Sequence, residues 1–219
     1  MTADDRREAA TALAAGGVTD VSRETRDQLV RLVELLREWQ KAQNLVGPSA
    51  LAEIWTRHVA DSAQLVAIAP TAKRWIDIGS GSGFPGLVVA ALLAEQSGAS
   101  VELIESNARK CAFLREAARV VGLPVTVHRG RIEDVLPALD PPDAVSARAL
   151  GSMVQLVAWL EPLLQRGVPA YLHKGLDFER EWLAIADPER FDLVLHPSRI
   201  GPGVIVELRA AAPGIRLET

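Results

Sequence analysis

Four glycines fall within eight residues of the stretch "RWIDIGSGSGFPGLVVAALLAE" (74–95), between a β-rich run and an apolar helical run. Glycine has no Cβ and tolerates positive φ, so a loop of this kind lets the backbone approach a ligand closely. In an open α/β sheet, ligands bind where strands end and helices begin. The stretch therefore predicts an α/β fold that holds a nucleotide-like ligand.

β-rich and helical runs alternate from Pro70 to the end of the chain, which predicts a parallel sheet with helices on both faces. The last two β-rich runs are joined only by "PSRIGPG" (197–203). This connection is too short for a parallel crossover, so we expect an antiparallel hairpin there. The expected sheet is mostly parallel and has seven strands: "RWIDI", "SVELIE", "VTVHR", "DAVSARA", "PAYLHK", "FDLVLH" and "GVIVELRA".

The first seventy residues predict helices and no strand. Apolar residues at helical spacing from Leu29 to Trp39, preceded by Ser22 as an N-cap, predict one helix, and residues 50–68 predict a second. Before them, "AAGG" (14–17) weakens any helix, so we expect a frayed end. The expected organisation is an N-terminal helical extension over residues 1–70 and an α/β domain over residues 71–219.

Composition narrows the class of protein. A net charge of −4 argues against a protein that coats nucleic acid non-specifically, although a local basic face is compatible with it. The longest apolar run, Leu87–Ala94, is far shorter than the ~20 residues of a membrane span, and no secretion signal is visible. Cys111 is the single cysteine and the four histidines are scattered. We expect a cytoplasmic protein with no membrane or metal site, acting as a monomer.

Two ligands fit the glycine loop. Residues 81–86, "GSGFPG", match the dinucleotide fingerprint, whereas residues 79–83, "GSGSG", match the loop of S-adenosyl-L-methionine (SAM) methyltransferases. Pro85 removes an N–H donor that a pyrophosphate needs at a helix N-terminus. Asp77 places negative charge near the loop, which suits the cationic sulfonium of SAM better than a pyrophosphate. The residues favour SAM, and a NAD-binding oxidoreductase is the alternative.

Other candidates follow the next strands. Glu105 ends its strand where a carboxylate can accept hydrogen bonds from both ribose hydroxyls. Ile132 and Glu133 are placed to meet an adenine, one as an apolar face and the other near its amino group. Arg148 and Lys174 end the fourth and fifth strands, where two cations suit RNA phosphate, a base carbonyl or the SAM carboxylate. An acidic protein that binds RNA needs a local basic face, and further candidates around its rim are Arg109, Lys110, Arg115, Arg129 and Arg131.

The acceptor of the methyl group can be narrowed by elimination. Methylation at cytosine C5 needs a cysteine near the substrate, whereas Cys111 lies on a predicted helix where burial is expected. "DPPD" (140–143) resembles a motif for amino-group methylation but lacks its aromatic residue and precedes its strand. Cations without an evident base fit guanine N7, which carries no proton and needs positioning more than acid–base help. We expect Arg148 and Lys174 to position substrate, with no general base; a non-catalytic SAM-binding RNA module is a further alternative.

From about Leu32 to Lys174 the chain resembles a known family. The segments "REWQKAQNL", "RHVADS", "DIGSGSGFPG", "IESNARKCAFL", "ARAL" and "KG" match its motifs in order, and the departures are mild, such as Gln40 where asparagine is usual. These segments are similar to those of the RsmG family of small-subunit rRNA guanine-N7 methyltransferases, also called glucose-inhibited division protein B.

The resemblance implies a class I SAM-dependent methyltransferase (Rossmann-like) fold with an N-terminal helical cap. It also implies methylation of a guanosine N7 in 16S rRNA, presented as RNA or within a small-subunit ribosomal particle. We expect His58 and Asp61, three residues apart on one helix face, to anchor the cap to the sheet rather than touch substrate. The expected cofactor contacts are Gly79, Phe84, Ile132, Glu133 and Arg148 from the resemblance, with Asp77, Gly81, Gly83 and Glu105 from the loop and strand ends.

Overall fold

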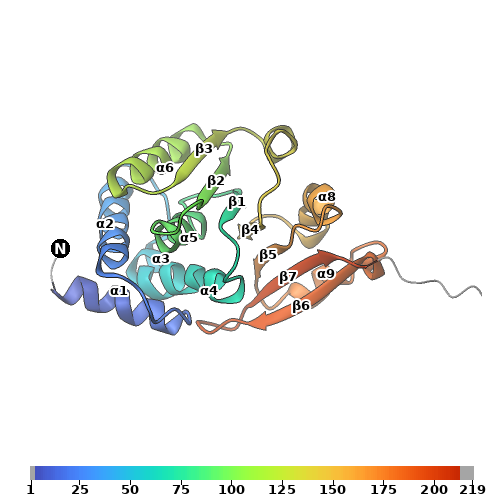
Figure 1. The fold of residues 1–219 in the computed structure, drawn as a ribbon, viewed down its shortest axis with the longest axis horizontal. Helices are drawn as coiled ribbons and strands as arrows, with labels where there is room; N and C mark the ends of the chain where they lie inside the picture. The colour runs from blue at the N-terminus through green and yellow to red at the C-terminus, as the bar shows by residue number, and fades with distance from the viewer. Residues whose placement is uncertain (1–2, 213–219) are drawn as a thin grey trace, which may run out of the picture.

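The computed structural model describes residues 3–212, which build a seven-stranded sheet with the order β3-β2-β1-β4-β5-β7-β6 (Figure 1). Strands β1 to β5 are parallel, and β7 is antiparallel to both β5 and β6. The expected mostly parallel sheet and its C-terminal hairpin are confirmed. The strands are β1 (Arg74–Ile78), β2 (Ser100–Glu105), β3 (Val125–Arg129), β4 (Ala144–Arg148), β5 (Ala170–Lys174), β6 (Phe191–Pro197) and β7 (Val204–Ala210).

Helices cover both faces of this sheet, and each face has its own hydrophobic core. One core contains the buried residues of α5 (Gly86–Leu93) and α6 (Ala108–Val121), together with those of the N-terminal helices. The other contains those of α8 (Met153–Leu164) and the short α7 (Ile132–Val135) and α9 (Phe178–Trp182). Two 3₁₀ turns, η2 (Leu136–Ala138) and η3 (Pro188–Arg190), complete this half.

The N-terminal region is helical, and no strand occurs in its described part, residues 3–70. Ser22 caps α2 (Arg23–Gln40) by accepting the Thr25 N–H at 3.0 Å, as expected. The single helix expected over residues 50–68 is instead divided into three segments: α3 (Pro48–Ala52), the π-helix η1 (Trp55–Ala60) and α4 (Asp61–Ile68).

The expectation of a frayed N-terminal end is wrong, because residues Ala3–Ala15 form the helix α1. Its residues Ala9 and Leu13 are fully buried, and α1 packs mainly against η1 and α2. Tertiary packing therefore stabilises a helix that its own composition would leave weak. The glycines of "AAGG" act only at its end, where Gly17 adopts a φ of +90°.

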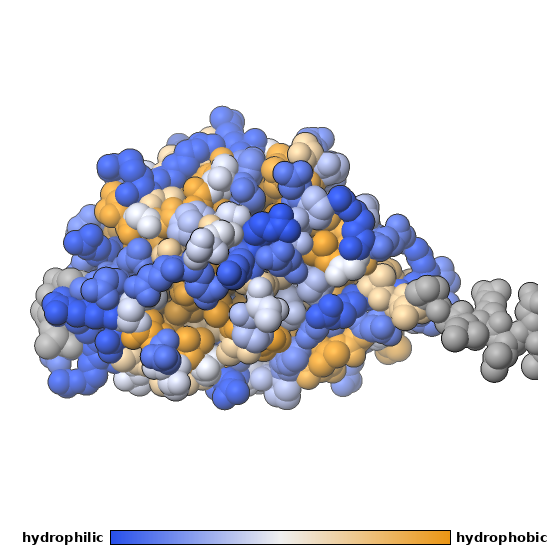
Figure 2. Space-filling view, in the orientation of Figure 1, coloured by the Kyte–Doolittle hydropathy of each residue, from blue (hydrophilic) through white to orange (hydrophobic). Residues whose placement is uncertain are grey.

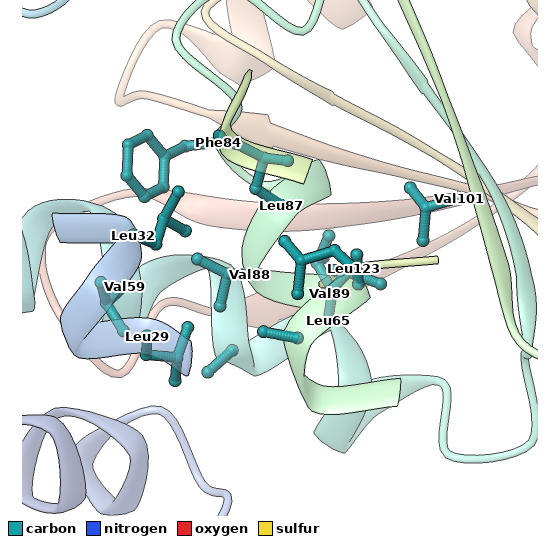
Figure 3. Close-up of a cluster of buried hydrophobic side chains, with 14 of the residues drawn as sticks. Leu29, Leu32, Val59, Leu65, Phe84, Leu87, Val88, Val89, Val101 and Leu123 are labelled. Atoms are coloured by element: carbon teal, nitrogen blue, oxygen red, sulfur yellow. The ribbon is translucent and has the colours of Figure 1, made fainter. Parts of the chain in front are cut away.

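The N-terminal helices pack against the α5 face of the sheet. Leu29 and Leu32 of α2 and Leu65 of α4 meet α5 in a continuous apolar cluster that also includes Phe84 of the glycine loop (Figure 3). Through this cluster the N-terminal helices, which form the helical cap, contact the glycine loop. In the orientation of Figure 1 the surface is mostly hydrophilic with small apolar areas (Figure 2). Among the described residues, no helix is both long and apolar enough to cross a membrane.

Candidate cofactor site

A cavity of about 560 Å³ opens at the carboxyl ends of the central strands. It lies beside β1, which has β2 on one side and β4 on the other, and this is where the strand order reverses. Such a switch point is where open α/β sheets bind ligands, and the volume suits a small molecule. The cavity is lined by Leu45, His58, Gly79–Ser82, Phe84, Ile104–Ser106, Lys110, Gly130–Glu133, Arg148–Leu150, Gln155 and Trp159.

The glycine loop forms one wall of the cavity, and its backbone needs glycine. Gly79, Gly81 and Gly83 have φ values of +65°, +58° and +92°. A Cβ at Gly79 would lie 2.6 Å from Leu150 Cδ1, and one at Gly83 would lie 2.3 Å from a methyl carbon of Leu87. The loop then leads into α5, which begins at Gly86 with Pro85 as its N-cap residue.

Glu105 joins this loop to the next helix. Its Oε2 accepts the Gly81 N–H at 2.9 Å, and its Oε1 accepts the N–H of Asn107, the N-cap of α6, at 2.7 Å. The residue is buried but lines the cavity. Each carboxylate oxygen can accept a second hydrogen bond. The carboxylate is thus held in place by the backbone and still presents acceptors to a ligand.

Asp77 lies beneath the loop and does not line the cavity. The residue is only 1% exposed, and its Oδ1 accepts the Ser146 hydroxyl at 2.7 Å, a bond that links β1 to β4. Burial raises the pKa of Asp77 to about 6, and the Ser146 hydrogen bond opposes this shift. Gly83 belongs to the loop but is likewise absent from the cavity lining, so neither Asp77 nor Gly83 is placed to contact a ligand in the cavity.

Arg148 connects the end of β4 to the N-terminal helices. Its Nε lies 3.2 Å from Asp61 Oδ2, its Nη2 donates to the Arg57 main-chain oxygen at 2.5 Å, and its Nη1 donates to His58 Nδ1. His173 on β5 also contacts Asp61, with Nε2 3.1 Å from its main-chain oxygen. Through these contacts His58 and Asp61 connect the helical cap to the ends of β4 and β5, while His58 also lines the cavity.

His58 also faces the ligand loop. Its ring packs on Phe84 with the ring centroids 4.7 Å apart. Burial, followed by the nearby charges of Arg148 and Arg57, lowers the pKa of His58 to about 3. The imidazole is neutral near pH 7 and keeps one ring proton. Because the Arg148 guanidinium can only donate, Nδ1 is the nitrogen without the proton and accepts this hydrogen bond.

Lys174 is not brought into the cofactor cavity. Its Nζ lies 2.6 Å from Glu181 Oε2 and donates to the Gly151 main-chain oxygen at 3.3 Å, and its side chain is 9% exposed. The same Glu181 oxygen accepts the N–H of Met153 at the start of α8. Lys174 lines a neighbouring cleft of about 380 Å³, which shares only Arg148 and Ala149 with the cofactor cavity. Its charge is thus balanced within the protein.

Several lining residues were not expected from the sequence. Gln155 and Trp159 of α8 lie one helical turn apart, and both line the cavity. Leu45 comes from the segment between α2 and α3. No local motif marks these positions, because they reach the cavity only through helix packing. Lys110 and Arg131, which the sequence offers as candidates for the basic rim, also line the cavity.

Known proteins match the chain over most of its length. The family model described as "GidB: rRNA small subunit methyltransferase G" matches residues 25–195. The chain is 50% identical to the ribosomal RNA small subunit methyltransferase G of Bradyrhizobium diazoefficiens, over 93% of this chain and 78% of that protein. It is 52% identical to the protein of the same name from Methylorubrum populi, over 82% and 85%.

Solved structures share the fold at low identity. An SAH-bound methyltransferase of Podospora anserina superposes with a TM-score of 0.59 at 17% identity, covering 88% of this chain and 98% of its own. A variant of MtNAS solved with S-adenosylmethionine gives a TM-score of 0.57 at 16% identity, covering 95% and 89%. The fold is thus that of class I methyltransferases, and by its sequence the chain belongs to the rRNA small subunit methyltransferase G (GidB) family.

Proposed function

We propose that the protein transfers a methyl group from SAM to N7 of a guanosine in 16S rRNA of the small ribosomal subunit. The observation that carries the proposal is the cavity at the β1/β4 switch point, where the glycine loop and the Glu105 carboxylate face one another. Family membership supports the same reaction. The two alternatives open from the sequence, a NAD-binding oxidoreductase and a non-catalytic RNA module, lack this support.

The cavity residues fit SAM. Gly79 lines the cavity without a side chain, so a ligand can approach its backbone closely. Glu105 would accept from the ribose hydroxyls, while Ile132 and Glu133 would flank the adenine on the far wall. Phe84 and Arg148 border the remaining space, where the methionine part would lie. When bound, SAM supplies an electrophilic methyl group on a sulfonium.

The residues around the cavity are suited to positioning rather than to proton transfer. Neutral His58 already accepts a hydrogen bond from Arg148 at Nδ1, and Asp77 is buried beneath the glycine loop. Guanine N7 carries a lone pair and no proton, so in-line attack needs alignment and exclusion of water more than a base. Arg148, held by the cap, forms the fixed wall between the cofactor cavity and the neighbouring cleft, and that cleft is the proposed place of the guanosine.

The remaining expectations belong to the same proposal. The protein would act as a monomer. Residues 1–70 would serve as a helical extension that fixes Arg148, and residues 71–219 as the methyltransferase domain. The substrate would be 16S rRNA, alone or within a small-subunit particle, and the reaction would take place in the cytoplasm, where that rRNA is found.

A cofactor titration tests the proposal. SAM at 100 times its dissociation constant is expected to stabilise the protein by ~2.7 kcal/mol. At 2–4 °C per kcal/mol for a chain of this size, the Tm should rise by roughly 5–11 °C. NAD at the same concentration should leave the Tm within error, and a larger shift with NAD than with SAM would contradict the proposal.

The variant Glu105→Gln tests whether SAM binds in the cofactor cavity. An amide offers one acceptor where the carboxylate offers two, so its NH₂ group would face the N–H of Gly81 or Asn107. The affinity for SAM should fall roughly 10- to 100-fold, equivalent to about 1.5–3 kcal/mol. Glu116→Gln, at the exposed Arg119 pair on α6, is the matched control and should bind SAM normally.

A further inference from the structure

Five basic side chains lie along the β3 side of the cofactor cavity. We name this set the β3 basic surface: Arg109, Lys110, Arg115, Arg129 and Arg131. Four of them are exposed and Lys110 is half-buried. Within residues 3–212, none of the five forms an ion pair with a carboxylate, whereas Arg119, Arg148 and Lys174 each do. The set therefore carries positive charge that the protein does not itself neutralise.

The fold brings these residues together around Glu105. Arg129 is the register partner of Glu105 at the ends of β3 and β2, and the following Gly130 N–H donates to the Glu105 main-chain oxygen at 3.1 Å. The Glu105 carboxylate holds Asn107, so Arg109 and Lys110 follow directly on α6. Lys110 and Arg131 both line the cofactor cavity.

Arg115 extends the surface along α6, which lies beside β3 (Figure 1). Its Nη2 donates to the Val127 main-chain oxygen at 3.1 Å, two residues before Arg129. The β3 basic surface thus includes residues from the middle of α6, from the end of β3 and from the lining of the cavity.

Two of these cations occupy a position that does not favour the helix. Arg109 and Lys110 lie in the first turn of α6, at the positive end of the helix dipole, where cations are unfavourable. Their side chains therefore do not support the local fold. In a protein of net charge −4, cations that pair with no carboxylate of the protein are the ones best placed to bind a polyanion. Arg148 and Lys174 are not of this kind, because each already pairs with a carboxylate of the protein.

We propose that the β3 basic surface binds the sugar–phosphate backbone of the substrate RNA away from the target guanosine, on the side of the cofactor cavity opposite Lys174. The inference rests on the proposed function, because it takes RNA as the substrate. The RNA would enter across α6 and the end of β3, with Lys110 and Arg131 at the rim of the cavity. Arg148 and Lys174 would contribute little to the salt dependence of binding, since their charges are already balanced.

The test is the double variant Arg109→Ala with Arg129→Ala, whose two residues are exposed and do not line the cofactor cavity. Binding to a 16S rRNA transcript is measured by filter retention between 50 and 200 mM KCl. Each lost phosphate contact should flatten the slope of log affinity against log salt by about 0.7 for single-stranded RNA. We expect a slope smaller by about 1.4, at least a tenfold loss of affinity at low salt, and an unchanged SAM affinity and Tm.

The control removes the same charge elsewhere, through Arg7→Ala with Arg23→Ala on the exposed sides of α1 and α2. It should keep nearly the wild-type slope. If the test variant keeps the wild-type slope, or if the control loses as much, the β3 basic surface is not the RNA contact and the inference is overturned. Failure of the proposed function is distinguishable, because the wild-type protein would then bind no SAM or no RNA.

Discussion

Asp61→Ala is expected to lower the free energy of unfolding by about 3–5 kcal/mol, the usual cost of stranding one member of a buried ion pair. The Asp61 and Arg148 side chains are 16% and 20% exposed, and their Oδ2 and Nε atoms are 3.2 Å apart. Burial already lowers the pKa of Arg148, and Asp61 is the counter-charge that opposes this shift. Urea unfolding measures the loss, and SAM affinity should fall as well, since Arg148 borders the cavity.

Glu53→Ala is the matched control for this prediction. Glu53 also pairs with an arginine of the cap, Arg57, at 3.3 Å, but the two side chains are 59% and 54% exposed. An exposed pair of this kind contributes at most about 1 kcal/mol. Equal and small losses in both variants would show that Asp61 does not hold the cap on the sheet.

Ionisation of the Asp77 carboxyl is expected to lower the free energy of unfolding as the pH rises from 4 to 7. Its pKa is about 6 in the folded protein against an ordinary value of 3.8. Between pH 3.8 and pH 6 the folded state binds more protons than the unfolded state, so the free energy of unfolding falls as the pH rises. The stability that the protonated Asp77 contributes is therefore fully present below pH 3.8 and is lost as the pH passes 6. The shift corresponds to about 3 kcal/mol at 1.36 kcal/mol per pKa unit.

The difference between wild type and Asp77→Asn isolates this contribution from the other titrating groups. Asparagine keeps an acceptor for the Ser146 hydroxyl but cannot ionise. Relative to wild type, the variant should gain about 3 kcal/mol of stability between pH 4 and pH 7, measured by urea unfolding at each pH. Ser146→Ala should move the wild-type transition to higher pH, because it removes a bond that lowers the pKa. Parallel pH profiles for wild type and Asp77→Asn would refute the assignment.

Much of the fold could be predicted from the sequence because its signals are local. Each strand is a short apolar run bounded by turn residues, and the length of "PSRIGPG" alone sets the direction of the final hairpin. The helix α1 and the π-helix η1 could not be predicted in this way. The first is stabilised by packing of Ala9 and Leu13, and the second breaks a segment whose spacing is helical throughout.

The cofactor site likewise has features that the sequence predicts and features that it does not. Glu105 and the glycine loop follow strands directly, so chain order places them at the cavity. The partners of Arg148 and Lys174 lie on other elements, Asp61 on α4 and Glu181 on α9, and no sequence spacing reveals such pairs. Two cations that end neighbouring strands therefore suggest a phosphate contact, whereas the structure balances both charges internally.

Methyl transfer to rRNA tests the central claim most directly. The purified protein is incubated with methyl-labelled SAM and either a 16S rRNA transcript or small subunits from a strain that lacks the modification, and the nucleosides are then separated by mass. The account predicts label in 7-methylguanosine, at one position of the 16S rRNA. Label in another nucleoside, or none on either substrate from protein that binds SAM, would contradict it.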